Sequence, residues 1–329
     1  MSLSSSLIPA HATPPEDSHF YRNTNLTVRS RDIIEADLLQ EASAAPDCTY
    51  PPSGIVSYAQ NHEDILLWRA LFDIQEGFYV DIGVQDPTVD SVTRAFYDRG
   101  WHGINIEPVT GYFDKLCRER PRDLTLQVAV GDRFGWSTLY EFPNSGLSTL
   151  VEEVAFGHRA RGLRDVQRRV PIVTLASVWA KFVRREVHFL KIDVEGYEGR
   201  VLSGMDLVNL RPWIILIEAT RPATSVAISE GWERILLNAR YELVHFDGLN
   251  CWYLAEERSN LKVRFEAPPN IFDQFELAAT VSLRDNLAAV KRDLERMRAS
   301  ASWRWTAPLR TARDGFCKLV ETLRSYFRR

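Results

Sequence analysis

Acidic residues directly after strand-like runs are the first sign of chemistry in this sequence. The apolar run 78–83 carries Asp81 and ends in Gly83, with Gln85 and Asp86 close behind. Ligands of open α/β sheets bind beyond the carboxyl ends of the strands, where a glycine lets the backbone approach them. An acidic side chain there can accept hydrogen bonds from an ammonium group, which suits the methionine part of S-adenosylmethionine better than a pyrophosphate. We therefore predict that these four residues bind this cofactor, although buried strands also end in Asp-x-Gly for reasons of turn geometry alone.

Glu107 ends the next strand-like run, 24 residues after Gly83. An acidic side chain at this place can bind the two ribose hydroxyls of a nucleoside, as it does in dinucleotide-binding proteins. A solvated strand-end carboxylate is the alternative, but the combination with Asp81 and Gly83 favours cofactor binding. A dehydrogenase is disfavoured, because residues 83–88 contain one glycine where Gly-x-Gly-x-x-Gly needs three, and because Asp86 would repel a pyrophosphate at the helix start.

The segment KIDVEGYE (191–198) brings three candidate catalytic residues, Lys191, Asp193 and Glu195, to the end of another buried strand run. At the mouth of a cleft, Asp193 or Glu195 can act as general base toward a substrate hydroxyl, or hold that hydroxyl in line with a methyl donor. Capping of a helix predicted over 198–205 accounts for the two carboxylates equally well. Both interpretations stay open at this stage.

Further strand ends carry weaker signals. Val130 and Asp132 are predicted to border the adenine, with Asp132 accepting its amino group, although an ordinary turn is the alternative. Glu218 ends another strand run, where we expect a structural role. No His/Asp/Glu group has clear metal spacing, so the sequence predicts no obligatory metal. A Mg²⁺ held by Asp193 and its neighbours stays open, because hard cations need only scattered oxygen ligands.

The segments that must position these residues alternate between strands and helices. Predicted strands cover 78–83, 103–107, 124–130, 187–193 and 213–219. Predicted helices cover 88–99, 109–120, 198–205 and 225–239. A final antiparallel pair is expected at 241–247 and 251–257, and residues 134–142 are typical of a small β insertion. The alternation predicts an α/β fold with a mostly parallel sheet covered by helices on both faces.

The two ends of the chain differ from this middle region. Residues 1–53, rich in Ser, Pro and Ala, are predicted to be a loosely ordered extension, and 54–276 the catalytic domain. Residues 277–329 are predicted to be a basic amphipathic helical tail, with 12 Lys or Arg against 5 Asp or Glu from residue 281 on. Through 300–329 this tail is expected either to contact a membrane surface or to pack on protein, including a second copy in a homodimer.

Composition excludes several function classes. The formal net charge of −4 gives the chain no nucleic-acid signature. The four cysteines are too sparse for a Cys-x-x-Cys metal site or a disulfide framework. With neither a secretory signal nor an 18-residue apolar window in the sequence, we expect a cytoplasmic protein, or one peripheral to the inner face of the membrane.

Six ordered segments resemble the FkbM methyltransferase family over about residues 57–276. They are SYAQNHEDILLWRAL, FYVDIGVQDPTVDSVTRAFYDRGWHGINIEP, QVAVGD, GLSTL, FLKIDVEGYEGRVLSGM and IEATRP. The resemblance implies a class I methyltransferase (Rossmann-like) fold with a seven-stranded sheet, followed here by C-terminal helices. It also implies S-adenosylmethionine as cofactor and methylation of a hydroxyl on a small-molecule or glycan acceptor.

The resemblance assigns roles to matching positions. Asp81 and Gly83 match the first cofactor motif, Glu107 the ribose-binding acid, and Asp193 and Glu195 the hallmark strand end. The family often has Gly-Ala-Asn where this chain has Gly-Val-Gln (83–85), so Val84 is expected to crowd the cofactor. If it closes the site, the alternative is a non-catalytic scaffold in a glycan-assembly complex. The tail segment SWRWTAPLR is similar to segments of polysaccharide-assembly proteins, which favours a glycan acceptor.

Overall fold

The computed structural model describes residues 50–51, 53–219 and 231–326 of the chain. Almost all of the predicted N-terminal extension therefore lies outside the described residues. Contacts divide the chain into one unit over Met1–Phe275 and a second over Glu276–Arg329, and each is described by itself.

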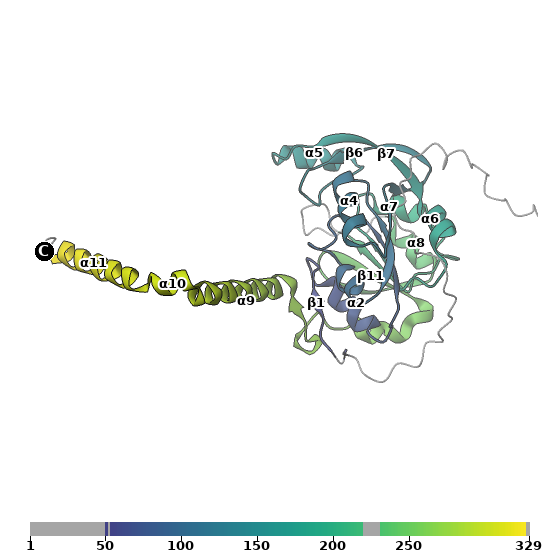
Figure 1. Ribbon diagram of the computed structural model, residues 1–329. Helices are drawn as coiled ribbons and strands as arrows, with labels where there is room; N and C mark the ends of the chain where they lie inside the picture. The colour runs from purple at the N-terminus through teal and green to yellow at the C-terminus, as the bar shows by residue number, and fades with distance from the viewer. Residues whose placement is uncertain (1–49, 52, 220–230, 327–329) are drawn as a thin grey trace, which may run out of the picture. The chain divides into compact units, whose positions relative to one another are not determined.

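The first unit is built on a seven-stranded sheet (Figure 1). Its strands, in spatial order, are β10 (Tyr241–Phe246), β11 (Asn250–Ala255), β9 (Ile214–Glu218), β8 (Phe189–Ile192), β2 (Phe78–Ile82), β3 (His102–Ile106) and β4 (Leu124–Leu126). The five strands from β9 to β4 run parallel, whereas β11 is antiparallel to both of its neighbours. The predicted α/β class and the final antiparallel pair are confirmed, in a mixed sheet.

The order of the strands creates a switch point between β2 and β8. From β2 the chain moves outward to β3 and β4, and it returns to the other side of β2 to form β8 and then β9. Connections on the two sides of this point leave in opposite directions, so a crevice opens beyond the carboxyl ends of the strands. The acidic strand ends predicted from the sequence therefore meet at one edge.

The central strands are apolar because both of their faces are covered. All five residues of β2 are buried. Val80 and Ile82 belong to the apolar cluster that contains residues of α6 (Leu175–Phe182), α7 (Glu198–Ser203) and α8 (Glu233–Asn238). Tyr79, on the other face, belongs to the cluster that contains residues of α2 (Glu63–Leu71) and α3 (Arg94–Asp98). This alternation is the period of two expected for a strand.

Two predicted elements are wrong in extent. The helix expected over 88–99 is limited to α3, because the carboxylate of Asp86 accepts the backbone N–H groups of Thr88 and Val89 and Asp90 has a left-handed backbone (φ 55°). The single strand expected over 124–130 is divided into β4 and β5 (Ala129–Gly131), which belong to different sheets.

Other predictions for the first unit agree with the structure. Strand β6 (Gly135–Glu141) forms the expected small β insertion, in a three-stranded sheet with β5 and β7 (Val166–Thr174). The helices expected over 109–120 and 198–205 are α4 (Thr110–Glu119) and α7. Of the helix expected over 225–239, the residues before 231 lie outside the described part. The remaining elements are β1 (Val56–Ser57), α5 (Glu152–Ala160), and the 3-10 helices η1 (Glu256–Phe265) and η2 (Ile271–Asp273).

A buried ion pair joins α2 to η2. Arg69 contacts both carboxylate oxygens of Asp273, with Nε to Oδ1 at 2.8 Å and Nη2 to Oδ2 at 2.6 Å. Both side chains are about 1% exposed. Arg69 also donates to three backbone carbonyl oxygens, so the donors of this buried guanidinium are well satisfied.

The second unit consists of β12 (Glu276–Leu277), α9 (Ala278–Ala299), α10 (Ala301–Trp305) and α11 (Ala307–Tyr326). The apolar side chains of α9 spaced by three and four residues are exposed: Leu283, Leu287, Val290, Leu294 and Met297. Among the helices of the described residues, none is long and apolar enough to cross a membrane.

Candidate functional site

A cavity of about 750 Å³ opens at the predicted edge of the sheet. It is lined by residues at or just after the carboxyl ends of four adjacent strands: Gly83 after β2, Glu107 after β3, Asp193 after β8 and Glu218 in β9. Its volume lies within the range of roughly 300–1,000 Å³ that is usual for small-molecule sites. The structure thus brings residues predicted from three separate segments, together with Glu218, around one cavity.

The turn after β2 requires a glycine. Gly83 has φ 80°, and a Cβ added there would lie 1.8 Å from the backbone oxygen of Asp193. Its N–H donates to the carbonyl oxygen of Ile106, and the N–H of Asp193 donates to that of Ile82, both at 3.0 Å. The side chain of Val84 is buried and does not line the cavity. The expected crowding of the cofactor by Val84 is therefore wrong in this structure, because the turn directs this side chain into the protein.

The carboxylate of Glu107 lines the cavity and is fixed by two backbone hydrogen bonds. Its Oε1 accepts the backbone N–H of Val109 at 2.8 Å, and its Oε2 accepts that of Gln85 at 2.9 Å. Burial raises the pKa of this carboxyl to about 7, although the two N–H groups act in the opposite direction. Each oxygen keeps a lone pair for a further donor, such as a ribose hydroxyl.

Asp81 and Lys191 lie behind the cavity wall instead of lining it. Asp81 is buried and accepts the hydroxyl of Thr93 at 3.0 Å. The ammonium of Lys191 donates to Asp193 Oδ2 at 2.9 Å and lies 3.9 Å from Asp81 Oδ1. Burial lowers the pKa of Lys191, but the carboxylates of Asp193 and Asp81 outweigh it and raise that pKa above its usual value. Lys191 therefore stays charged and orients Asp193.

The capping interpretation of Asp193 and Glu195 is wrong. Helix α7 has Tyr197 at its N-cap and no side-chain cap. Glu198 is the residue that satisfies this turn, since its Oε1 accepts the N–H groups of Val194 and Gly196 at 3.2 and 3.0 Å. The carboxylates of Asp193 and Glu195 are therefore left for the cavity, which both residues line.

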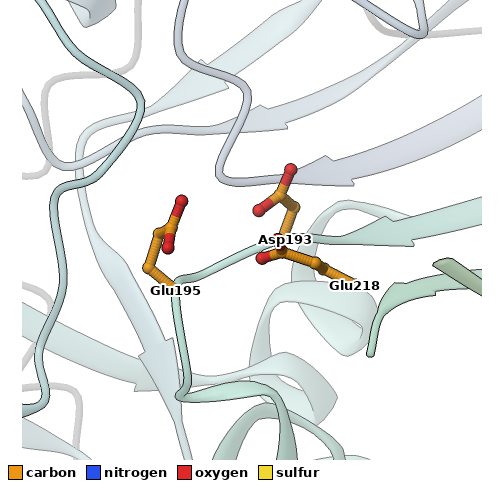
Figure 2. A group of neighbouring side chains, drawn as sticks. All are labelled: Asp193, Glu195 and Glu218. Carbon is orange, nitrogen blue, oxygen red and sulfur yellow. The ribbon is translucent and has the colours of Figure 1, made fainter. Parts of the chain in front are cut away.

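Glu218 joins these two carboxylates (Figure 2). Oxygen atoms of Asp193, Glu195 and Glu218 lie within 4.8 Å of one another. Burial and the neighbouring negative charges, first of all that of Asp193, raise the pKa of Glu195 and of Glu218. The sequence analysis identified Glu218 only as the end of a strand, with an expected structural role. Its position at the end of the buried apolar run that follows the run ending at Asp193 is the signal that could have assigned it to the site.

Besides Asp81, two more predicted cofactor residues, Asp86 and Asp132, do not line the cavity. Asp86 accepts backbone N–H groups of its own turn and pairs with Lys115. Asp132 pairs with Arg200 and does not line the cavity, whereas Val130 does. Val130 therefore lies where an adenine ring could contact it, whereas the carboxylate of Asp132 is engaged in a surface ion pair.

Sequence reasoning missed part of the lining. Tyr112 in α4 accepts a hydrogen bond from Gln85 Nε2 and donates one to the carbonyl oxygen of Ser145, both at 3.4 Å. The loop 145–148 lines the cavity, as does Gln60 before α2. No strand end marks these positions, so reasoning from strand ends could not find them.

A comparison with protein families matches residues 81–243 to the model described as the methyltransferase FkbM domain. The chain contains a methyltransferase FkbM domain. The match begins at Asp81 and includes every acidic residue that lines the cavity at a strand end. The family resemblance noted in the sequence is thereby confirmed.

Two solved structures show distant likeness to this chain. The methyltransferase FkbM from Methylobacillus flagellatus KT is 16% identical, with a TM-score of 0.34 over 55% of this chain and 43% of that one. A TehB-like SAM-dependent methyltransferase from Corynebacterium glutamicum is 7% identical, with a TM-score of 0.32 over 59% of this chain and 88% of that one. This chain thus spans less than half of the Methylobacillus protein. Comparison with curated proteins gives no match.

Proposed function

We propose that this chain is an S-adenosylmethionine-dependent O-methyltransferase that acts on a hydroxyl of a sugar or glycan. The observation that carries the proposal is the cavity at the switch point, with Glu107 on one wall and the carboxylates of Asp193 and Glu195 on another. These three acidic residues lie within the matched methyltransferase FkbM domain. The alternative scaffold role depended on Val84 closing the site, and Val84 does not line it.

The residues present fit this cofactor. Gly83 lines the cavity, and its missing side chain lets the turn pack against the backbone of Asp193, which holds the strand ends around the cofactor space close together. Glu107 offers two anchored oxygens to the ribose hydroxyls, and Val130 an apolar surface to the adenine. The bound cofactor supplies a methyl group on a sulfonium ion.

The chain's own residues would position the acceptor. Asp193, fixed by the ammonium of Lys191, would orient the acceptor hydroxyl toward the methyl group. Glu195 would accept the hydroxyl proton, since a carboxyl whose pKa is raised toward neutrality is matched to that task. The balanced reaction forms a carbon–oxygen bond, breaks the carbon–sulfur bond with its electron pair left on sulfur, and moves the proton to the carboxylate.

The proposed acceptor class has support from the polar part of the lining. The polar residues Gln60, Ser145 and Ser148 are part of the lining, and a partly polar lining suits an acceptor rich in hydroxyls. The resemblance of the tail segment 302–310 to polysaccharide-assembly proteins points to the same class. Acceptor recognition is therefore proposed for the wall formed by the loop 145–148.

The test is transfer of a labelled methyl group to a panel of sugars and oligosaccharides. With an accepted sugar, we expect Asp193→Asn to lower kcat by about 100-fold or more, as is usual for lost acid–base or positioning groups, while cofactor affinity stays within about threefold. Glu256→Gln, at an exposed ion pair outside the cavity, is the matched control and should retain full activity. Labelling that is unaffected by Asp193→Asn would contradict the proposed role.

A further inference from the structure

We propose that Asp193, Glu195 and Glu218 form a binding site for a hard divalent cation such as Mg²⁺ or Mn²⁺. The site is assembled by two neighbouring parallel strands, β8 and β9. Ile192 pairs with Ile217 in their register, so the next residue of each strand, Asp193 and Glu218, comes out at the same level. Glu195 reaches the same place from the turn that follows β8, and Figure 2 shows the three carboxylates gathered there.

The environment of Glu195 is the second observation that points to a ligand. This residue is only 9% exposed, and its Oε2 has no hydrogen-bond partner among the described parts of the chain. A buried carboxylate oxygen without a donor is costly, so such an atom calls for a partner that the protein itself does not supply. Glu195 also lines the cavity, so a partner can reach it from there.

The local charge balance favours a cation as this partner. Among the described residues, Lys191 is the positively charged side chain that contacts the cluster, and its ammonium donates to Asp193. The carboxylates of Glu195 and Glu218 remain without an ion pair among the described residues. A divalent cation bound between the three carboxylates would neutralise this excess of negative charge.

The donor set selects the kind of cation. All three groups offer oxygen, with no His or Cys among them, which favours Mg²⁺, Mn²⁺ or Ca²⁺ over Zn²⁺ or copper. Opposite ligands of Mg²⁺ lie about 4.2 Å apart, twice its usual bond length. The oxygen atoms here lie within 4.8 Å of one another, so small side-chain movements suffice to close the site. The remaining coordination positions would face the cavity and hold water or an acceptor oxygen.

This inference deepens the proposed function and rests on it for its purpose. A cation in this place would bind the acceptor hydroxyl, hold it in line with the methyl group and ease the loss of its proton. A carboxylate that binds the cation through one oxygen keeps its other oxygen to accept that proton. The sequence predicted no obligatory metal, because Glu218 meets Asp193 and Glu195 only in the folded sheet.

The experiment titrates Mn²⁺ into the full chain after chelator treatment, with free Mn²⁺ followed by electron paramagnetic resonance. We expect one Mn²⁺ per chain, and at least about tenfold weaker binding in both Glu218→Gln and Glu195→Gln, the scale usual for perturbed metal sites. Glu256→Gln, an exposed acid outside the cluster, is the control and should bind as the wild type does. Circular dichroism identifies any variant that fails to fold, in which case the other one decides.

The outcomes separate the cation site from the proposed function. Absence of Mn²⁺ binding, or equal binding in the wild type and in a folded Glu218→Gln or Glu195→Gln variant, overturns the cation site and favours carboxyls that share protons. Calorimetry of S-adenosylmethionine on the same samples tests the proposed function. A chain that binds the cofactor but not Mn²⁺ refutes the cation site alone, and one that binds Mn²⁺ but not the cofactor refutes the proposed function alone.

Discussion

Replacement of Glu107 by Gln tests the centre of the proposed cofactor site. The wild-type carboxylate is already held by two backbone N–H groups, those of Val109 and Gln85, so its orientation does not depend on the ligand. Its two oxygens would each accept one ribose hydroxyl. The amide of Glu107→Gln keeps one oxygen and turns an NH₂ group toward one of these backbone donors, where no hydrogen bond is possible.

The magnitude follows from the hydrogen bonds that change. A hydrogen bond to a charged group contributes about 1.5–3 kcal/mol and a neutral one about 0.5–1.5 kcal/mol, so each hydroxyl loses about 1–1.5 kcal/mol. For two hydroxyls this is about 2–3 kcal/mol, or roughly 30- to 140-fold in the Kd of S-adenosylmethionine. The assay is isothermal titration calorimetry at pH 8, where the wild-type carboxyl is ionised.

The pH dependence gives the prediction a second readout. Because the pKa of Glu107 is raised to about 7 by burial, the carboxyl is mainly protonated at pH 6 and mainly ionised at pH 8. Only the ionised form accepts both hydroxyls, so wild-type affinity should rise by up to about tenfold over this interval. Glu107→Gln should lose this rise. Asp132→Asn, which changes an exposed ion pair outside the cavity, should bind like the wild type.

Two results would refute this reasoning. A folded Glu107→Gln protein with a Kd within about threefold of the wild type would show that the carboxylate does not contact the ribose. A wild-type affinity that is constant between pH 6 and pH 8 would show that its ionisation is not linked to binding. Weakening by Asp132→Asn would instead support the adenine contact that the sequence suggested.

Three further predictions concern the turn, the ion pair and the tail. Gly83→Ala should weaken cofactor binding by at least about tenfold and lower the melting temperature, because its Cβ would lie 1.8 Å from the oxygen of Asp193 at a left-handed φ. Asp273→Ala should lower the free energy of unfolding by about 3–5 kcal/mol in urea denaturation, because it leaves the buried guanidinium of Arg69 unpaired. Deletion of 300–329 should reduce co-sedimentation with anionic vesicles, because the basic tail loses its electrostatic attraction.

Each of these has a control or a contradicting outcome. Glu256→Ala removes an exposed ion pair and should lower the free energy of unfolding by less than about 1 kcal/mol. If Asp273→Ala lowered it by no more than this control, the proposed role of burial would be contradicted. Wild-type cofactor affinity in Gly83→Ala would mean that the turn can move. Equal sedimentation of full and shortened chains would reject membrane contact and leave Trp305, Leu309 and Phe316, which are exposed, to a protein partner.

Much of the site could be predicted from strand ends. Buried parallel strands appear as continuous apolar runs, and the residues that follow them reach the same edge of the sheet whichever helices connect them. This is why the sequence alone predicts Gly83, Glu107 and Asp193 as residues of one site. The same logic identified Glu218 as a strand end, but it could not show which other strand lies beside it.

Hydrogen bonds to residues outside the pattern account for the two elements that sequence patterns misjudged. The apolar spacing of 88–99 suggested a full helix, yet the carboxylate of Asp86 satisfies the N–H groups of Thr88 and Val89 in a turn instead. The alternating run 124–130 suggested one strand, yet its two halves pair with different sheets. In both cases a pattern compatible with two structures was decided by contacts outside the pattern.

The sequence by itself determined the α/β class, the order of the elements and the acidic edge of the sheet, because these depend on apolar periodicity along the chain. Only the tertiary structure decided which polar side chains face the cavity. In the folded chain Asp132 forms a surface ion pair, and Glu198 accepts the hydrogen bond from the backbone N–H of Val194 in the turn before α7. The register of β8 and β9 brings Glu218 beside Asp193. Side-chain direction and strand neighbourhood depend on contacts between residues far apart in the chain, and no local pattern encodes them.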